Sequence, residues 1–161
     1  IKDIRALSMK KHRDETGTFL AEGLKLVIDP GSQMADVPPE LPRDQLVSAL
    51  GNVIDNALEA TRFQCGEGGI VHLSMTDLGN DLIFEIEDQG PGVEPAQQER
   101  IFERGVTNKP DGDHGIGLYL VRQFVERWGG SVTIENLQPA GSRFTLYLPK
   151  LSLSKLSQPN R

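Results

Sequence analysis

The sequence predicts an α/β domain of the α+β type, a two-layer sandwich in which a mixed, mostly antiparallel sheet carries helices on one face. Alternating apolar residues mark strands over 70–76, 81–87 and 143–148. Apolar residues at helical spacing mark two longer elements, over 43–63 and 117–128. The order of these elements along the chain gives one sheet rich in antiparallel pairs, with both helices on the same side.

The N-terminal third has a less regular sequence. Residues 1–22 are charged and weakly periodic, which predicts either an N-terminal arm or a frayed helix left from a preceding helical region. Residues 24–28 alternate and are followed by Asp-Pro-Gly-Ser, so a short strand is expected there. The prolines of 37–42 predict a rigid, extended connector, because each restricts its own backbone and its predecessor's. The first long helix then begins at Arg43, and Cys65-Gly66 closes it.

The middle of the chain predicts a hairpin followed by irregular structure. Asp77-Leu78-Gly79-Asn80 is a good turn between the strands 70–76 and 81–87. Residues 94–102 predict a short helix. Residues 103–114 are polar, contain glycine and are interrupted by a proline, which predicts a mobile loop of about a dozen residues.

The C-terminal part predicts the second helix and two more strands. The helix over 117–128 ends at Gly129-Gly130, a good C-cap signal. Strands over 131–135 and 143–148 follow, joined by a Pro-Ala-Gly turn. Residues 151–161 are rich in Ser, Lys and Pro and predict a flexible tail, so the folded domain is expected over 23–150.

Composition restricts the class of protein. The 161 residues, 37% hydrophobic and 25% charged, fit one globular domain. The net charge of −6 argues against a nucleic-acid partner. A single cysteine, Cys65, excludes an internal disulfide and fits a reducing compartment, so a cytoplasmic location is expected. No apolar run approaches the ~20 residues that span a bilayer, so no direct membrane contact is expected. The first residue, Ile1, suggests a piece of a longer parent.

Two asparagines on the first helix are candidate metal-site residues. Asn52, Asn56 and Glu59 stand at i, i+4 and i+7, which places them on one face. Carboxamide oxygens are hard, neutral ligands that suit Mg²⁺, which takes its remaining ligands from water and phosphates. The alternative is a solvated or locally hydrogen-bonded asparagine pair. Asparagine is a mediocre helix former, so two of them inside a strong helix need some reason.

An acid at a strand end is a candidate for recognising a base. Asp88 directly follows the strand 81–87 and can accept a hydrogen bond from an exocyclic amine. Gly90 and Gly92 would let a flat ring lie close to the backbone. The alternative is a Gly-Pro turn with a surface aspartate.

The turn before the second helix is a candidate phosphate site. In Gly115-Ile116-Gly117-Leu118, glycines allow backbone N–H groups to approach an anion, and the helix N-terminus adds unpaired donors. The loop before it would be a lid over the phosphates, anchored by Phe102, or else a solvated loop without a specific role. Its candidate contacts are Arg104, Thr107, Asn108, Lys109 and His114.

These segments together are typical of a known family. NVIDNALEA (52–60), DQGPG (88–92), IFERGVTNK (101–109), HGIGL (114–118) and GSRFTLYLP (141–149) occur in this order. The series resembles the ATP-binding domain of the GHKL superfamily, which includes sensor histidine kinases, type II topoisomerases, heat-shock chaperones and MutL-type repair proteins. The resemblance covers about residues 24–150 and is strongest for the citrate and C4-dicarboxylate sensor kinases. It implies the Bergerat ATP-binding fold.

The resemblance implies a role for each matching position. Asn56 would coordinate Mg²⁺ with Asn52 beside it, and Asp88 would bind the adenine amino group of ATP. The glycines before the second helix would offer backbone to the phosphates under the lid, and Thr145 would be a weaker candidate on the adenine side. The residues expected at the ATP site are Asn52, Asn56, Asp88, Gly90, Gly92, Phe102, Arg104, Thr107, Lys109, His114, Gly115, Ile116, Gly117, Leu118 and Thr145.

The implied activity is transfer of the γ-phosphoryl group of Mg·ATP to a histidine on an acceptor domain outside this chain. The implied partners are the histidine-bearing dimerisation domain of the parent kinase and a response regulator, with the parent anchored in the inner membrane and this part in the cytoplasm. His12-Arg13-Asp14 superficially resembles an acceptor motif, but it lacks the apolar seam of a dimerising helix. The chain is therefore expected to be monomeric.

The chain departs from many relatives near the phosphates. Many relatives carry a basic and an aromatic residue at the positions of Glu59 and Ala60, so in this chain Lys109 or Arg104 would have to supply the cation.

Two other functions stay open. One is an ATP-responsive regulatory module, or an anti-sigma-like serine kinase. The other is an ATP-hydrolysing clamp, whose relatives usually carry Glu where Asn52 stands, because a carboxylate can activate water and an amide cannot.

Overall fold

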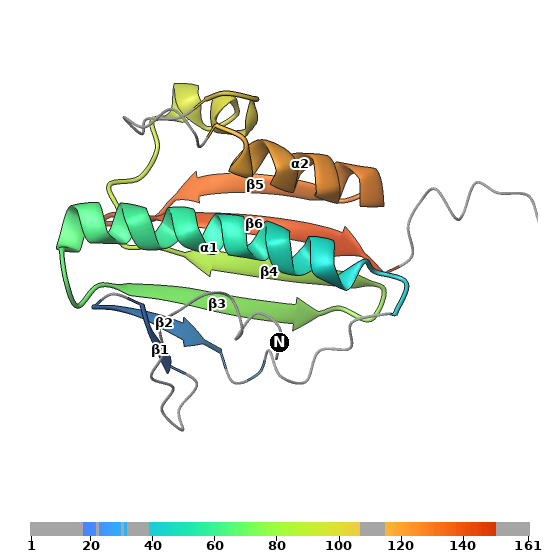
Figure 1. The fold of residues 1–161 in the computed structure, drawn as a ribbon, viewed down its shortest axis with the longest axis horizontal. Coiled ribbons are helices and arrows are strands. Elements are labelled where there is room, and N and C mark those ends of the chain that lie inside the picture. Colours follow the sequence, from blue (N-terminus) through green and yellow to red (C-terminus); the bar gives the residue numbers. More distant parts are fainter. Residues whose placement is uncertain (1–17, 22, 30, 32–38, 107–114, 151–161) are drawn as a thin grey trace, which may run out of the picture.

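Six strands form one mixed sheet, and two α-helices cover one of its faces (Figure 1). The computed structural model describes residues 18–21, 23–29, 31, 39–106 and 115–150. The strands are β1 (Thr18–Ala21), β2 (Leu24–Ile28), β3 (Ile70–Asp77), β4 (Asp81–Glu87), β5 (Ser131–Asn136) and β6 (Ser142–Pro149). The helices are α1 (Arg43–Cys65) and α2 (Gly117–Trp128).

The strands lie in the order β1-β2-β3-β4-β6-β5, so the last strand of the chain is inserted between β4 and β5. β2 and β3 pair in parallel, with α1 as the crossover between them. The other described neighbours are antiparallel. A two-layer sandwich with a mixed, mostly antiparallel sheet is the predicted fold class, and the structure confirms it.

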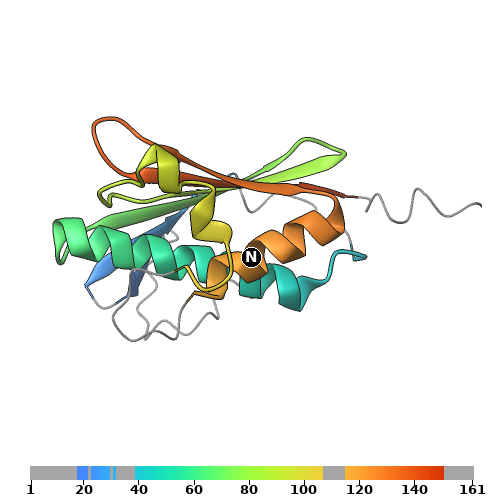
Figure 2. The same cartoon turned by 90° about the horizontal axis from the view of Figure 1, so that it is seen from above.

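The core lies between the sheet and the two helices, which are on the same side (Figure 2). The alternation of β4 and β6 turns every second side chain toward the helices, and the helical apolar stripes meet them. The largest fully buried side chains of these elements are Leu50, Val53 and Ile54 of α1, Val121 of α2, Leu82, Phe84 and Ile86 of β4, and Leu146 and Leu148 of β6. None of the described helices has the length and apolar content to cross a bilayer.

The helix ends follow their sequence signals. α2 stops at Gly129, which has a left-handed φ of 93°. The Gly129 N–H bonds the Glu126 carbonyl at 3.0 Å, and the Gly130 N–H bonds the Val125 carbonyl at 2.7 Å. The two glycines thus form the predicted cap. α1 ends at Cys65, before Gly66, as expected.

Two expectations about secondary structure are wrong. Thr18–Ala21 were expected in a helix or an arm, but they form β1, because the edge of β2 supplies backbone partners that no local pattern reveals. Residues 94–102 do not form an α-helix. Two short 3₁₀ turns, Pro95–Gln97 and Arg100–Phe102, replace it, because the segment must bring Phe102 into the core within a few residues. Residues 1–17, most of the expected lid 103–114 (its residues 107–114) and the tail 151–161 lie outside the described residues.

Candidate functional site

Two carboxamides of α1 face the start of α2 with their oxygens available. Asn52 Nδ2 donates a hydrogen bond to the Gly117 carbonyl at 3.3 Å, and Asn56 Nδ2 donates to the Asn52 carbonyl at 2.8 Å. A carbonyl can only accept, so each NH₂ group must face it, and each Oδ1 points elsewhere. Neither Oδ1 has a protein hydrogen-bond partner in the described part of the chain. The pair therefore presents two neutral oxygen ligands on one helix face.

Asp88 is a buried acid with one oxygen held and one free. Its side chain follows β4 and the residue is 4% exposed. Oδ1 accepts the Gly90 N–H at 2.8 Å and the Ser142 N–H at 3.1 Å. Oδ2 has no hydrogen-bond partner among the described residues. Burial raises the pKa of the Asp88 carboxyl, and the two backbone hydrogen bonds partly oppose that rise. A buried acceptor without a donor is costly, so Oδ2 is available to accept a hydrogen bond.

The loop after Asp88 is packed against the C-terminal half of α1. A Cβ at Gly90 would lie 2.7 Å from Ala60 Cβ, so the loop can approach the helix this closely with glycine there. The Gln89 N–H donates to the buried Thr61 hydroxyl oxygen at 3.1 Å. Gln89 Oε1 accepts the Ile70 N–H at 2.8 Å. These contacts fix Asp88 and Gly90 relative to the two asparagines.

A pair of glycines holds the two sides of the segment 107–114 together. The Gly105 N–H donates to the Gly115 carbonyl at 2.7 Å. A Cβ at Gly115 would lie 2.5 Å from the Cα and carbonyl carbon of Gly105. A Cβ at Gly117 would instead lie 3.7 Å from Asn52 Cγ, an ordinary contact. Packing thus requires glycine at position 115, whereas a Cβ at position 117 would make only an ordinary contact with Asn52.

The remaining predicted residues lie in different surroundings. Phe102 is 3% exposed and packs edge-to-face on Phe144, with ring centroids 6.2 Å apart, so it is a core anchor. Arg104 and Ile116 are exposed at the surface, and Leu118 packs against the core. The expected contacts Thr107, Asn108, Lys109 and His114 lie outside the described residues.

Thr145 is not brought to Asp88. It pairs with Glu85 of β4 and Thr133 of β5, on the sheet face that carries no helix. Ser142 is on the helix side, 3% exposed, and its N–H bonds Asp88. Sequence reasoning missed Ser142, although a signal exists. Every second residue of this strand is buried, as Phe144, Leu146 and Leu148 show. Ser142 stands two residues before Phe144 and therefore lies on the same buried face.

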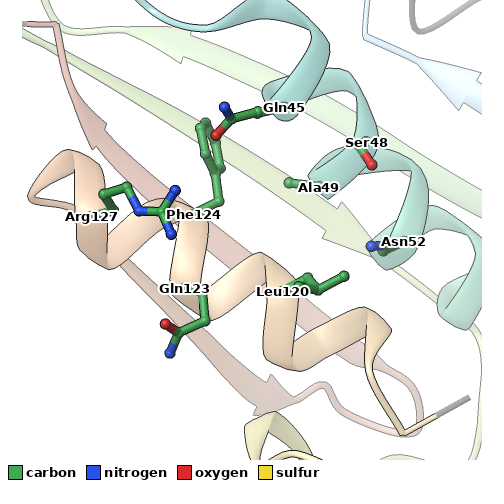
Figure 3. Close-up of a pocket in the computed structure, with 8 residues that line it drawn as sticks. All are labelled: Gln45, Ser48, Ala49, Asn52, Leu120, Gln123, Phe124 and Arg127. Atoms are coloured by element: carbon green, nitrogen blue, oxygen red, sulfur yellow. The ribbon is translucent and has the colours of Figure 1, made fainter.

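A groove of about 180 Å³ runs between α1 and α2 and ends at Asn52 (Figure 3). Asn52 and Leu120 lie at one end, and Gln45 and Arg127 lie at the other. Its lining residues are Gln45, Ser48, Ala49, Asn52, Leu120, Gln123, Phe124 and Arg127. Of the two asparagines only Asn52 lines the groove, and Asp88 does not line it.

Comparisons with known proteins agree with this geometry. The family described as histidine kinase-, DNA gyrase B-, and HSP90-like ATPase matches residues 42–152. A second family, the MRM3-like substrate binding domain, matches residues 1–38. Sensor histidine kinase DpiB of Escherichia coli (strain K12) is 44% identical over 132 residues, which are 80% of this chain and 24% of DpiB. Sensor histidine kinase CitA of Klebsiella pneumoniae is 43% identical over 127 residues, 79% of this chain and 23% of CitA.

Solved structures give the same result. The nucleotide-free catalytic domain of histidine kinase ThkA has a TM-score of 0.61 at 28% identity, covering 69% of this chain and 70% of that one. Full-length ShkA in complex with AMPPNP has a TM-score of 0.61 at 26% identity, covering 79% of this chain and 26% of that one. The chain spans about a quarter of the length of the curated relatives it matches.

Proposed function

The chain belongs to the histidine kinase-, DNA gyrase B-, and HSP90-like ATPase family, and we propose that it is the ATP-binding catalytic domain of a two-component sensor histidine kinase. In this role it would transfer the γ-phosphoryl group of Mg·ATP to a histidine on an acceptor domain. The observation that carries the proposal is the buried Asp88 carboxylate, whose Oδ2 has no donor among the described residues.

Asp88 would bind the base of ATP. An adenine offers a 6-amino group, which can donate to Oδ2, whereas a guanine has a carbonyl oxygen at the same position and would be repelled. The two backbone N–H groups on Oδ1 fix the direction in which Oδ2 accepts. The buried Ser142 hydroxyl lies on the same side of the sheet as Asp88, beside the expected base. Gly90 and Gly92 would shape this end of the site indirectly, because they let the loop after Asp88 pack closely on Ala60 and Asn136.

Asn56 and Asn52 would hold the metal end of the site. Their Oδ1 atoms suit Mg²⁺, which binds through oxygen ligands and retains several waters or phosphate oxygens. Bound Mg²⁺ would neutralise charge on the phosphates and orient them. The backbone of Gly115 and Gly117, at the start of α2, would face the phosphates. Arg104, and Lys109 outside the described residues, are the candidate cations, since Glu59 cannot supply one.

The amide chemistry at position 52 favours transfer over hydrolysis. Asn52 can orient a group by hydrogen bonding, but it cannot remove a proton from water. A neutral imidazole nitrogen carries its own lone pair and needs no base to attack a phosphoryl group. Phosphoryl transfer depends mainly on positioning and charge neutralisation, which the asparagines and backbone amides of this site would provide.

The partners follow from the same proposal. The curated relatives DpiB and CitA are named sensor histidine kinases, and this chain spans about a quarter of each. We therefore propose a histidine-bearing dimerisation domain and a response regulator as partners. The parent would be anchored in the membrane, with this domain in the cytoplasm.

A phosphotransfer assay tests the proposal. The chain is incubated with γ-labelled ATP, Mg²⁺ and a separately purified histidine-acceptor domain, from its parent or from a relative such as DpiB. Acid-labile label on the acceptor histidine is expected, together with its loss in Asp88→Asn. ATP turnover without labelled histidine would instead indicate an ATP-hydrolysing clamp. Label that is stable to acid, on a serine of a partner, would indicate the anti-sigma-like alternative.

A further inference from the structure

We infer that Asn136 is a positioning residue for the adenine end of the site, because its carboxamide holds the loop after Asp88 as a neighbouring strand would. Asn136 Oδ1 accepts the Val93 N–H at 2.8 Å, and Asn136 Nδ2 donates to the Val93 carbonyl at 2.8 Å. One side chain thus satisfies both backbone groups of a residue that lies in no strand. This inference rests on the proposed binding of adenine at Asp88.

The position of Asn136 in the sheet links it to Asp88. Asn136 is the last residue of β5, and its partner in β6 is Ser142. The Ser142 N–H in turn donates to Asp88 Oδ1 at 3.1 Å. The loop from Asp88 to Val93 is therefore held at its start by Ser142 and at its end by Asn136, two residues that face each other across the same ladder. A shift of this ladder would move both ends of the loop together.

Gly92 shows that the contact is close. Its φ is +83°, a left-handed conformation that favours glycine, and a Cβ there would lie 2.9 Å from Asn136 Oδ1. Val93 beyond it packs partly buried against the core, which anchors the far side of the contact. Gln98 Nε2 also donates to the Val93 carbonyl, at 3.3 Å, so this oxygen keeps one donor when Asn136 is removed. The Val93 N–H has Asn136 as its partner within the described chain.

Asn136 does not belong to the groups expected to touch the nucleotide. Its side chain is exposed and directed to Val93, so its removal costs little of the core. The effect of Asn136 should therefore appear in nucleotide affinity, through the loop, and not in the rate of phosphoryl transfer once ATP is bound. A residue with a merely structural role would lower stability and leave the affinity of the folded protein unchanged.

Two substitutions test the inference by calorimetric titration of the purified chain with Mg·ADP. Asn136→Ala removes both hydrogen bonds and should raise the Kd about threefold to tenfold, the range for one or two partly exposed hydrogen bonds. Asn136→Asp keeps the shape and the acceptor, but sets a carboxylate oxygen against the Val93 carbonyl. It should be at least as weak a binder as the alanine variant at neutral pH.

Asn80→Ala is the matched control, because Asn80 is an exposed asparagine at the opposite end of β4, in the β3–β4 turn. It should bind Mg·ADP like the parent chain. In Asn136→Ala the phosphotransfer rate at saturating ATP should stay within about twofold of the parent, because the loop acts on binding.

The outcomes separate the two proposals. If Asp88→Asn binds Mg·ADP as tightly as the parent chain, the proposed adenine site is wrong. If Asp88→Asn is weak but both Asn136 variants bind like Asn80→Ala, the adenine site stands and the positioning role of Asn136 is wrong. A fall in the saturated rate of Asn136→Ala without a change in Kd would also overturn the inference.

Discussion

Alanine at Gly115 and alanine at Gly117 should have different effects, although both glycines belong to the same turn. At Gly115 a Cβ would lie 2.5 Å from two backbone carbons of Gly105, roughly 1 Å inside a normal carbon contact. The backbone of Gly105 cannot step aside without losing its 2.7 Å hydrogen bond to the Gly115 carbonyl. Overpacking costs about 1–3 kcal/mol and a lost hydrogen bond about 0.5–1.5 kcal/mol. Gly115→Ala should therefore lower the free energy of unfolding by about 1.5–4.5 kcal/mol.

Gly117→Ala provides the matched comparison. The nearest side-chain atom, Asn52 Cγ, would be 3.7 Å from the new Cβ, so the free energy of unfolding should change by less than about 0.5 kcal/mol. If the Gly117 backbone faces the phosphates, the same methyl group should still weaken Mg·ADP binding. Urea titration measures the stability and calorimetry measures the Kd. Equal stability of Gly115→Ala and the parent chain would refute the packing argument, as would a large loss of stability in Gly117→Ala.

Three further substitutions test other parts of the site. Asp88→Asn keeps the acceptor for the two backbone amides but replaces Oδ2 by a donor, so Mg·ADP affinity should fall at least ~10-fold. The fold should be as stable as the parent or more so, because the raised pKa of the Asp88 carboxyl means that its charged form is disfavoured in the folded protein at neutral pH. For the same reason, ADP affinity in the parent should fall as the pH drops through this raised pKa, which lies above the ordinary 3.8, whereas Asp88→Asn should show no such loss in that window. Asn56→Ala should remove most of the Mg²⁺ dependence of ADP binding and leave metal-free binding nearly unchanged; equal Mg²⁺ dependence in both proteins would exclude Asn56 as a ligand. Phe102→Ala should lower the free energy of unfolding by about 3–5 kcal/mol in urea, because the ring is 3% exposed and packs on Phe144, and a loss below about 1 kcal/mol would contradict a core role.

The periodic elements could be predicted from sequence because their burial is periodic. The helical spacing that places Asn52 and Asn56 on one face is fixed by helix geometry, and the structure keeps it. The direction of the Asn52 amide could not be predicted, because it depends on the Gly117 carbonyl of a distant segment. The Asn56 amide bonds the Asn52 carbonyl one turn earlier in the same helix, a local hydrogen bond that the sequence had left open as an alternative. The alternation of apolar residues along β6 can be seen in the sequence, and it places Ser142, not Thr145, on the buried face of the strand.

Other features depend on contacts between distant segments and leave no local pattern. β1 exists because β2 offers an open edge, and four residues are too few to show a period. The packing of Gly115 on Gly105 requires both sides of the segment between them to meet in space. The link from Asn136 to Val93 joins residues 43 positions apart, and an asparagine at a strand end is otherwise unremarkable in sequence.

The insertion of β6 between β4 and β5 has a consequence for the order of events during synthesis. β5 leaves the ribosome before β6, yet in the finished sheet it is β6 that joins it to β4. A nascent chain that stops short of Ser142 therefore has a β5 without this neighbour and an Asp88 without one of its two backbone donors. A premature stop before β6 would therefore leave the facing edges of β4 and β5 unpaired, in addition to the outer edges of β1 and β5, and unpaired strand edges favour aggregation.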